Sequence, residues 1–146
     1  MQFQFLLPTK IVMEPGLRQR TGEHLLGLGL SHVLLVTDPG VKNAGLLDSI
    51  YASLEQAGIR YDEIADVKPN PRSEDVNRAA QLYRGKGIDG VLAVGGGSAM
   101  DAAKAISVLL THDGIVEDYE GAFALKNAVL PIVAIPTTAG TGAETE

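Results

Sequence analysis

Glycine and threonine gather in two short segments where they could hold a phosphate group. Three glycines and a serine follow one another at Gly95-Gly96-Gly97-Ser98, and the segment 137–142 reads Thr-Thr-Ala-Gly-Thr-Gly. Residues without a Cβ let backbone N–H groups approach a pyrophosphate closely, and hydroxyl groups add further donors. Both segments therefore have the residue types of an anion-binding loop.

The glycine run has two interpretations. In the first, it binds a pyrophosphate together with the helix that follows, although Met100 stands where the Rossmann fingerprint has its third glycine. In the second, it is a tight turn in which Ser98 caps that helix and Asp101 completes a capping box. Three successive glycines cost backbone entropy that a plain turn would not need, and this favours a ligand.

Asp38 is the acidic residue best placed to meet a nucleotide. It ends an apolar run, where its carboxylate could accept hydrogen bonds from ribose hydroxyls and would repel a 2′-phosphate. The alternative is an Asx turn before Pro39 and Gly40.

The threonine segment has two possible roles, and the sequence does not favour either. Thr137, Thr138 and Thr141 could bind a phosphate or the amide of a nicotinamide ring, or they could cap the backbone of a polar connection.

Other kinds of site have little support. The three histidines, His24, His32 and His112, have no carboxylate cluster and no i, i+4 pair, so we expect each of them at the surface and none in a metal site. The chain has no cysteine, which excludes a disulfide and a thiolate metal site. No Ser-His-acid combination stands out for acyl transfer.

The composition predicts one soluble globular domain. The 146 residues are 45% apolar and carry a net charge of -6, which offers no surface for nucleic acid. No apolar segment approaches the ~20 residues that span a bilayer, and the N-terminus lacks a secretory pattern. We therefore expect a cytoplasmic protein without nucleic-acid or membrane partners.

Strand and helix patterns alternate along the chain. Continuous apolar runs at 33–37, 90–94 and 131–135 predict strands buried on both faces, and weaker patterns predict strands at 10–13 and 59–64. Apolar residues at helical spacing predict helices at 17–28, 46–57, 73–83 and 100–110, and a helical turn at 116–119. Gly58 is the expected C-terminal cap of the second helix, and Ser73 the N-cap of the third.

This alternation predicts an α/β fold, with a mainly parallel sheet flanked by helices. Because parallel strands end at the same edge, the loops at 38–40, 68–71, 95–98 and 137–142 should lie together there. Near the end of the chain, Thr141 and Glu144 form a capping-box pattern, and only two residues follow Glu144. A helix that starts and does not continue leads us to expect a piece of a longer protein.

Three segments, 38–40, 95–104 and 136–144, in this order and spacing closely resemble the iron-containing alcohol dehydrogenases. The resemblance covers nearly the whole chain. It implies a Rossmann-like fold, the N-terminal domain of a dehydroquinate synthase-like fold, with residues 1–146 as the NAD(P)-binding domain. It also implies a C-terminal helical domain, absent from this chain, whose aspartate and histidines hold iron or another divalent metal.

The resemblance implies a role for particular residues. Asp38 would meet the adenosine ribose, Gly96, Gly97 and Ser98 the pyrophosphate, and the threonine loop the cofactor cleft. The full set of implied cofactor-binding residues is Asp38, Asn70, Gly96, Gly97, Ser98, Asp101, Thr137, Thr138 and Thr141. Ala143 replaces a usual serine and Thr145 a common valine, which leaves the finer specificity of that loop open.

The implied activity is hydride transfer between a primary or secondary alcohol and NAD, in preference to NADP, with the metal polarising the alcohol oxygen. The parent enzyme would take a small alcohol or aldehyde and could be a homo-oligomer, whereas we expect the chain alone, which has no catalytic residue, to be inactive. Two alternatives stay open: a domain of a zinc enzyme such as glycerol dehydrogenase or dehydroquinate synthase, and a non-catalytic nucleotide-binding domain.

Overall fold

A parallel sheet forms the centre of the computed structural model, which describes residues 11–12, 17–119 and 129–137. The order of its strands is β1-β5-β4-β2-β3, and every pair is parallel. This confirms the predicted α/β fold. The strands are β1 (Ile11–Val12), β2 (His32–Thr37), β3 (Arg60–Ile64), β4 (Gly90–Gly95) and β5 (Ile132–Pro136).

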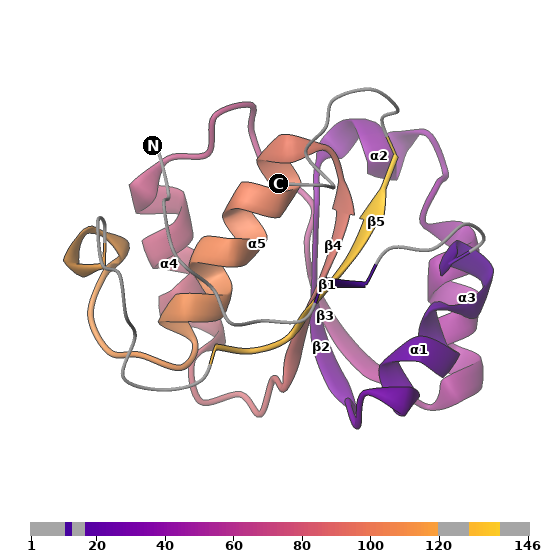
Figure 1. Ribbon diagram of the computed structural model, residues 1–146. Helices are drawn as coiled ribbons and strands as arrows, with labels where there is room; N and C mark the ends of the chain where they lie inside the picture. The colour runs from indigo at the N-terminus through magenta and orange to yellow at the C-terminus, as the bar shows by residue number, and fades with distance from the viewer. Residues whose placement is uncertain (1–10, 13–16, 120–128, 138–146) are drawn as a thin grey trace.

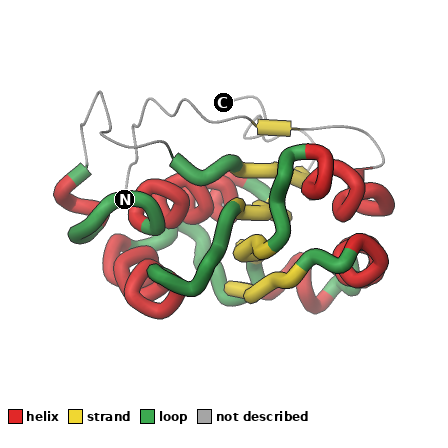
Figure 2. Tube along the Cα trace, turned by 90° about the horizontal axis from the view of Figure 1, so that it is seen from below, coloured by secondary structure: helices red, strands yellow, loops and turns green. Residues whose placement is uncertain are grey.

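Helices cover both faces of the sheet (Figure 1). Figure 2 shows the same arrangement, with the yellow strands lying between red helices. One face packs against α1 (Thr21–Gly27) and α3 (Asp48–Ala57), and the other against α4 (Ser73–Tyr83) and α5 (Gly97–Leu109). The remaining elements are the short helix α2 (Pro39–Asn43) and two 3-10 turns, η1 (Leu17–Arg20) and η2 (Val116–Asp118). None of the described helices is both long and apolar enough to cross a bilayer.

Strand β2 shows why continuous apolar runs predict the centre of this sheet. Val33 and Leu35 point into the core under α1 and α3, whereas Leu34 and Val36 point into the core under α4 and α5. All four side chains are fully buried. Since successive residues of a strand face opposite sides, only a strand covered on both faces can be apolar throughout.

The predicted helices at 17–28 and 46–57 need small corrections, since the first is divided into η1 and α1 and the second begins later than predicted. Gly58 caps α3 in the left-handed conformation, with a φ of 72°, as expected. The helix begins at Asp48, however, and a separate short helix, α2, precedes it. In α1 Leu26 is exposed, although it shares the apolar pattern of its neighbour Leu25, which is fully buried.

The expected N-cap at Ser73 is wrong, and the alternative in which Ser98 caps a helix does not hold either. Ser73 is the first residue of α4, because the carbonyl of Arg72 already accepts from the N–H groups of Asp75 and Val76. Ser98 does not cap α5, which begins at Gly97, three residues before the predicted start. Gly96 is its N-cap, and no side chain caps the first turn.

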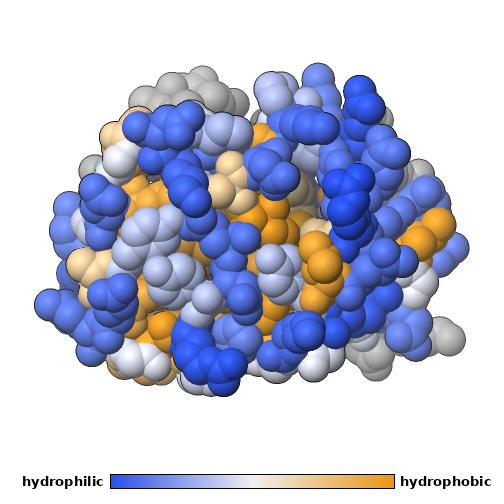
Figure 3. Space-filling model, turned by 180° about the vertical axis from the view of Figure 1, so that it is seen from behind, coloured by the Kyte–Doolittle hydropathy of each residue, from blue (hydrophilic) through white to orange (hydrophobic). Residues whose placement is uncertain are grey.

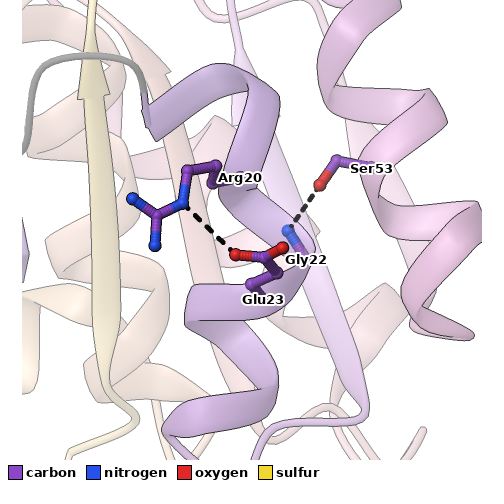
Figure 4. Close-up of polar contacts among 4 residues, drawn as sticks. All are labelled: Arg20, Gly22, Glu23 and Ser53. Carbon is purple, nitrogen blue, oxygen red and sulfur yellow. Dashed lines mark hydrogen bonds and ion pairs between the residues drawn. The ribbon is translucent and has the colours of Figure 1, made fainter.

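Helices α1 and α3 approach closely at Gly22 (Figure 4). The Gly22 N–H donates to Ser53 Oγ over 2.8 Å, and a Cβ at Gly22 would lie 2.7 Å from that of Ala57 and clash with the Ser53 carbonyl. An ion pair between Arg20 and Glu23, 3.2 Å, lies beside this contact. Gly22 therefore sets how closely the two helices pack.

Candidate functional site

The chain changes direction within the sheet between β2 and β4. After β2 it passes through α2 and α3 to β3 on one side, whereas after β4 it passes through α5 toward β5 on the other. Helices α3 and α5 cover opposite faces, so the loops after β2 and β4 diverge at the carboxyl ends of these strands. In open α/β sheets this topological switch point is where ligands bind.

Asp38 lies at this point, directly after β2. Its Oδ1 accepts from the Val41 N–H over 2.9 Å, so Asp38 caps α2. Asp38 therefore does have the alternative role, in the turn that starts before Pro39 and Gly40. Its Oδ2 faces β4, because a Cβ at Gly95 would lie 3.1 Å from it. Among the residues described, no hydrogen bond uses Oδ2, so one oxygen of this half-buried carboxylate is available to a ligand.

Gly95 ends β4 in a conformation that requires glycine. Its φ is 144°, in the region that L side chains rarely adopt. A Cβ there would also come within 3.2 Å of the Ala99 Cβ, besides the contact with Asp38. Sequence reasoning placed Gly95 in a pyrophosphate-binding loop or a tight turn, and missed that it lets the loop and the carboxylate of Asp38 approach each other.

The first turn of α5 begins at the same edge. Its N-cap Gly96 is extended, with φ -101° and ψ -154°, and Gly96, Gly97 and Ser98 are all half-buried. The first N–H groups of a helix have no partner within the helix, and the helix dipole is positive at this end. With no capping side chain, this turn of a 13-residue helix fits an anion such as a pyrophosphate.

The threonine loop starts beside the glycine loop. The Thr137 N–H donates to the Gly95 carbonyl over 3.2 Å, and Thr137 is half-buried. The carboxyl ends of β2, β4 and β5 thus meet at one edge, as predicted. Thr138 and Thr141, the other two predicted threonines, lie outside the described residues.

Asn70 and Asp101 lie further from this centre. Asn70 is exposed in the loop after β3, and its φ of 53° is the only positive value at a non-glycine residue in the described ranges. The start of that loop reaches the same edge, because the Val67 N–H donates to the Thr37 carbonyl. Asp101 is exposed on α5, four residues after Gly97 and so roughly 6 Å further along the helix axis.

A charged cluster that sequence reasoning missed lies beside α2. Lys42 Nζ donates to Glu63 Oε2 over 2.7 Å, and the Tyr51 hydroxyl donates to the other oxygen, Oε1. Burial raises the pKa of Glu63, but these two bonds outweigh it and hold the pKa below its usual range. Burial and the bond to Glu63 raise the pKa of Tyr51. The residues come from three elements, so no local pattern marks them.

Two cavities lie near these elements. A small one of about 10 Å³ lies against the glycine loop, between Gly95, Met100 and Pro136. A larger one of about 340 Å³ lies between α4, α5 and the β3–α4 loop, and none of the glycine-loop residues line it. Among the residues described, the candidate nucleotide site is thus an open edge of the sheet.

The expectation that all three histidines lie at the surface is wrong. His32 and His112 are each 7% exposed. His32 Nε2 lies 2.8 Å from Asp62 Oδ2, and His112 Nδ1 lies 3.0 Å from the Val108 carbonyl, so tertiary packing buries rings that no apolar pattern marks. In the described part of the chain, no group of three or more His, Cys, Asp or Glu could hold a metal.

Comparison with known proteins shows what this chain is similar to. The model of the family "Iron-containing alcohol dehydrogenase" matches residues 8–146. Choline dehydrogenase of Bacillus subtilis (strain 168) is 48% identical over 143 residues, which cover 96% of this chain and 36% of that protein. The chain therefore spans little more than a third of the length of this relative.

Solved structures share the fold. NADH-dependent butanol dehydrogenase A from Thermotoga maritima is 34% identical, with a TM-score of 0.80 over 97% of this chain and 36% of that one. Sulfoacetaldehyde reductase from Bifidobacterium kashiwanohense, solved in complex with NAD+, is 30% identical, with a TM-score of 0.78 over 98% of this chain and 38% of that one.

Proposed function

The chain belongs to the iron-containing alcohol dehydrogenase family, and we propose that it is the NAD-binding domain of an enzyme that transfers hydride between a primary or secondary alcohol and NAD. In this proposal a second, helical domain of the parent enzyme holds iron or another divalent metal. The substrate of the parent is a small alcohol or aldehyde, as the names of the relatives suggest.

One observation carries the proposal: the available oxygen of Asp38 and the uncapped first turn of α5 lie side by side at the switch point of the sheet. A dinucleotide has a ribose hydroxyl pair next to a pyrophosphate, so it needs an acceptor beside an anion site. Gly95 removes the Cβ that would otherwise fill the space between the two. The residues present therefore fit this cofactor.

The same carboxylate supports NAD over NADP. Asp38 would accept hydrogen bonds from the ribose hydroxyls of NAD, whereas the 2′-phosphate of NADP would bring a second negative charge against it. Gly96, Gly97 and Ser98 would donate to the pyrophosphate at the N-terminus of α5. Thr137, beside Gly95, would line the cleft next to them.

In this proposal the cofactor and the metal supply the chemistry of the reaction, and this domain holds the cofactor. NAD supplies the hydride acceptor when bound, which no protein side chain can replace. The metal of the parent enzyme would polarise the alcohol oxygen. We therefore propose that the 146 residues bind cofactor and do not turn over alcohol by themselves.

Titration calorimetry with NAD, NADP and ATP tests this function. We expect NAD to bind at least about tenfold more tightly than NADP, because the Asp38 carboxylate would repel the 2′-phosphate. A tenfold difference in dissociation constant corresponds to about 1.4 kcal/mol of binding free energy. ATP, which shares only the adenosine and phosphate parts, should bind more weakly than NAD. Tighter binding of ATP, or no binding of any dinucleotide, would contradict the proposal and favour a nucleotide-sensing domain.

A further inference from the structure

The short helix α2 is attached to the rest of the molecule at few points. It has five residues, and of these only Val41 is buried. A helix this short is not stable by itself in water. Its place is thus set by Val41 in the core, by the cap at Asp38 and by the link from Lys42 to Glu63.

Glu63 is a rigid attachment point for this helix. It lies on the edge strand β3. The face of the molecule seen from behind is largely hydrophilic, with apolar side chains showing between the polar ones (Figure 3). Its side chain is only 18% exposed, and both carboxylate oxygens have donors, from Lys42 and Tyr51. The Tyr51 ring in turn stacks on Tyr61, with centroids 5.5 Å apart. These contacts restrain the Glu63 carboxylate, and through it the Lys42 ammonium group.

We propose that Glu63 is a positioning residue for Asp38: by holding Lys42 it fixes α2, and so keeps Asp38 Oδ2 beside Gly95, where the adenosine ribose would meet it. Asp38 is the N-cap of α2, so a shift of the helix moves the carboxylate with it. Displacements of about 1 Å are enough to weaken a binding site. The inference rests on the proposed function, because it requires Asp38 to accept from ribose.

A ratio of affinities tests this role. The dissociation constants are measured for NAD and for NAD that lacks the 2′-hydroxyl of its adenosine ribose, and their ratio reports the bond to Asp38. A hydrogen bond to a charged acceptor should make the ratio about tenfold or more in the native protein. Asp38→Ala sets the ratio expected when the carboxylate is absent.

Two variants remove the link at either end. Glu63→Gln removes the charge with little change of shape, and Lys42→Met removes the ammonium group. We expect each to lower the ratio at least about threefold toward that of Asp38→Ala, and the double variant to go no further than either single one, since both break the same contact. Lys42→Arg keeps the cation and should stay within about twofold of the native ratio.

Matched controls separate positioning from general destabilisation. Lys86→Met removes an exposed lysine that lies before β4, at the amino ends of the strands and so opposite the candidate site. Tyr61→Phe removes a hydroxyl next to Tyr51 for which the described residues show no hydrogen bond. Both should leave the ratio unchanged. Thermal melting checks that every variant is folded at the temperature of the titration.

The two ways of failing can be told apart. If the native protein discriminates between the two cofactors and Glu63→Gln and Lys42→Met discriminate equally well, the positioning role is wrong and the proposed function stands. If the native protein itself binds both cofactors equally, Asp38 does not meet the ribose, and the positioning role falls together with that part of the proposed function.

Discussion

Gly95 and Asp38 are 57 residues apart in the chain and meet where β4 and β2 end. Asp38 uses one carboxylate oxygen to cap α2 and turns the other toward Gly95, whose missing Cβ leaves it room. The sequence indicated a role for each residue, since Asp38 ends an apolar run and Gly95 starts a glycine run. Their contact could not be predicted, because it depends on β2 and β4 being neighbours in the sheet.

Gly95→Ala tests this contact. The added methyl group would lie 3.1 Å from Asp38 Oδ2 and 3.2 Å from the Ala99 Cβ, on a backbone that disfavours any L side chain. We expect the affinity for NAD to fall at least about tenfold, because the carboxylate and the start of α5 must move apart. The measurement is titration calorimetry with NAD.

Gly87→Ala is the matched control for Gly95→Ala. Gly87 also has a positive φ, 83°, but it precedes β4, and a Cβ there would meet only His32, at 3.9 Å. We expect this variant to lose about 1–2 kcal/mol of stability from the backbone alone and to bind NAD like the native protein once folded. Equal affinities of both alanine variants for NAD would remove Gly95 from the site.

At the scale of elements, strand centres were easier to predict than helix starts. The runs at 33–37 and 90–94 identified β2 and β4 to within one residue, because burial on both faces leaves only apolar side chains. The start of α5 was misplaced by three residues and Ser73 was wrongly made the N-cap of α4, since neither helix begins with a side-chain cap. Helix α2 was missed because five residues are too few to show a period.

The contact between α1 and α3 gives a prediction about stability. Gly22→Ala would force a methyl group against the Ser53 carbonyl and the Ala57 Cβ, so the two helices must separate. We expect the free energy of unfolding to fall by about 1–3 kcal/mol, the usual cost of overpacking. Chemical denaturation measures it.

Gly27→Ala is the control on the same helix. A Cβ at Gly27 meets nothing within 4 Å. Because alanine is the better helix former, we expect this variant to be as stable as the native protein or more stable by up to about 1 kcal/mol. If Gly22→Ala were equally well tolerated, the close approach of α1 and α3 would not depend on glycine.

At the scale of the whole molecule, the alternation of strands and helices predicted the fold class and the common edge of the loops. It did not predict the strand order, and the order is what creates the switch point between β2 and β4. Strand order depends on how each helix crosses the sheet, which apolar spacing does not encode. The Lys42–Tyr51–Glu63 cluster was beyond reach for the same reason, since it joins α2, α3 and β3.

The central claim is that NAD binds at this switch point, and a crystal structure of the protein with NAD tests it most directly. We predict the pyrophosphate at the N–H groups of Gly96, Gly97 and Ser98, and the adenosine ribose within hydrogen-bond distance of Asp38 Oδ2. NAD bound elsewhere, for example in the 340 Å³ cavity between α4 and α5, would contradict the account.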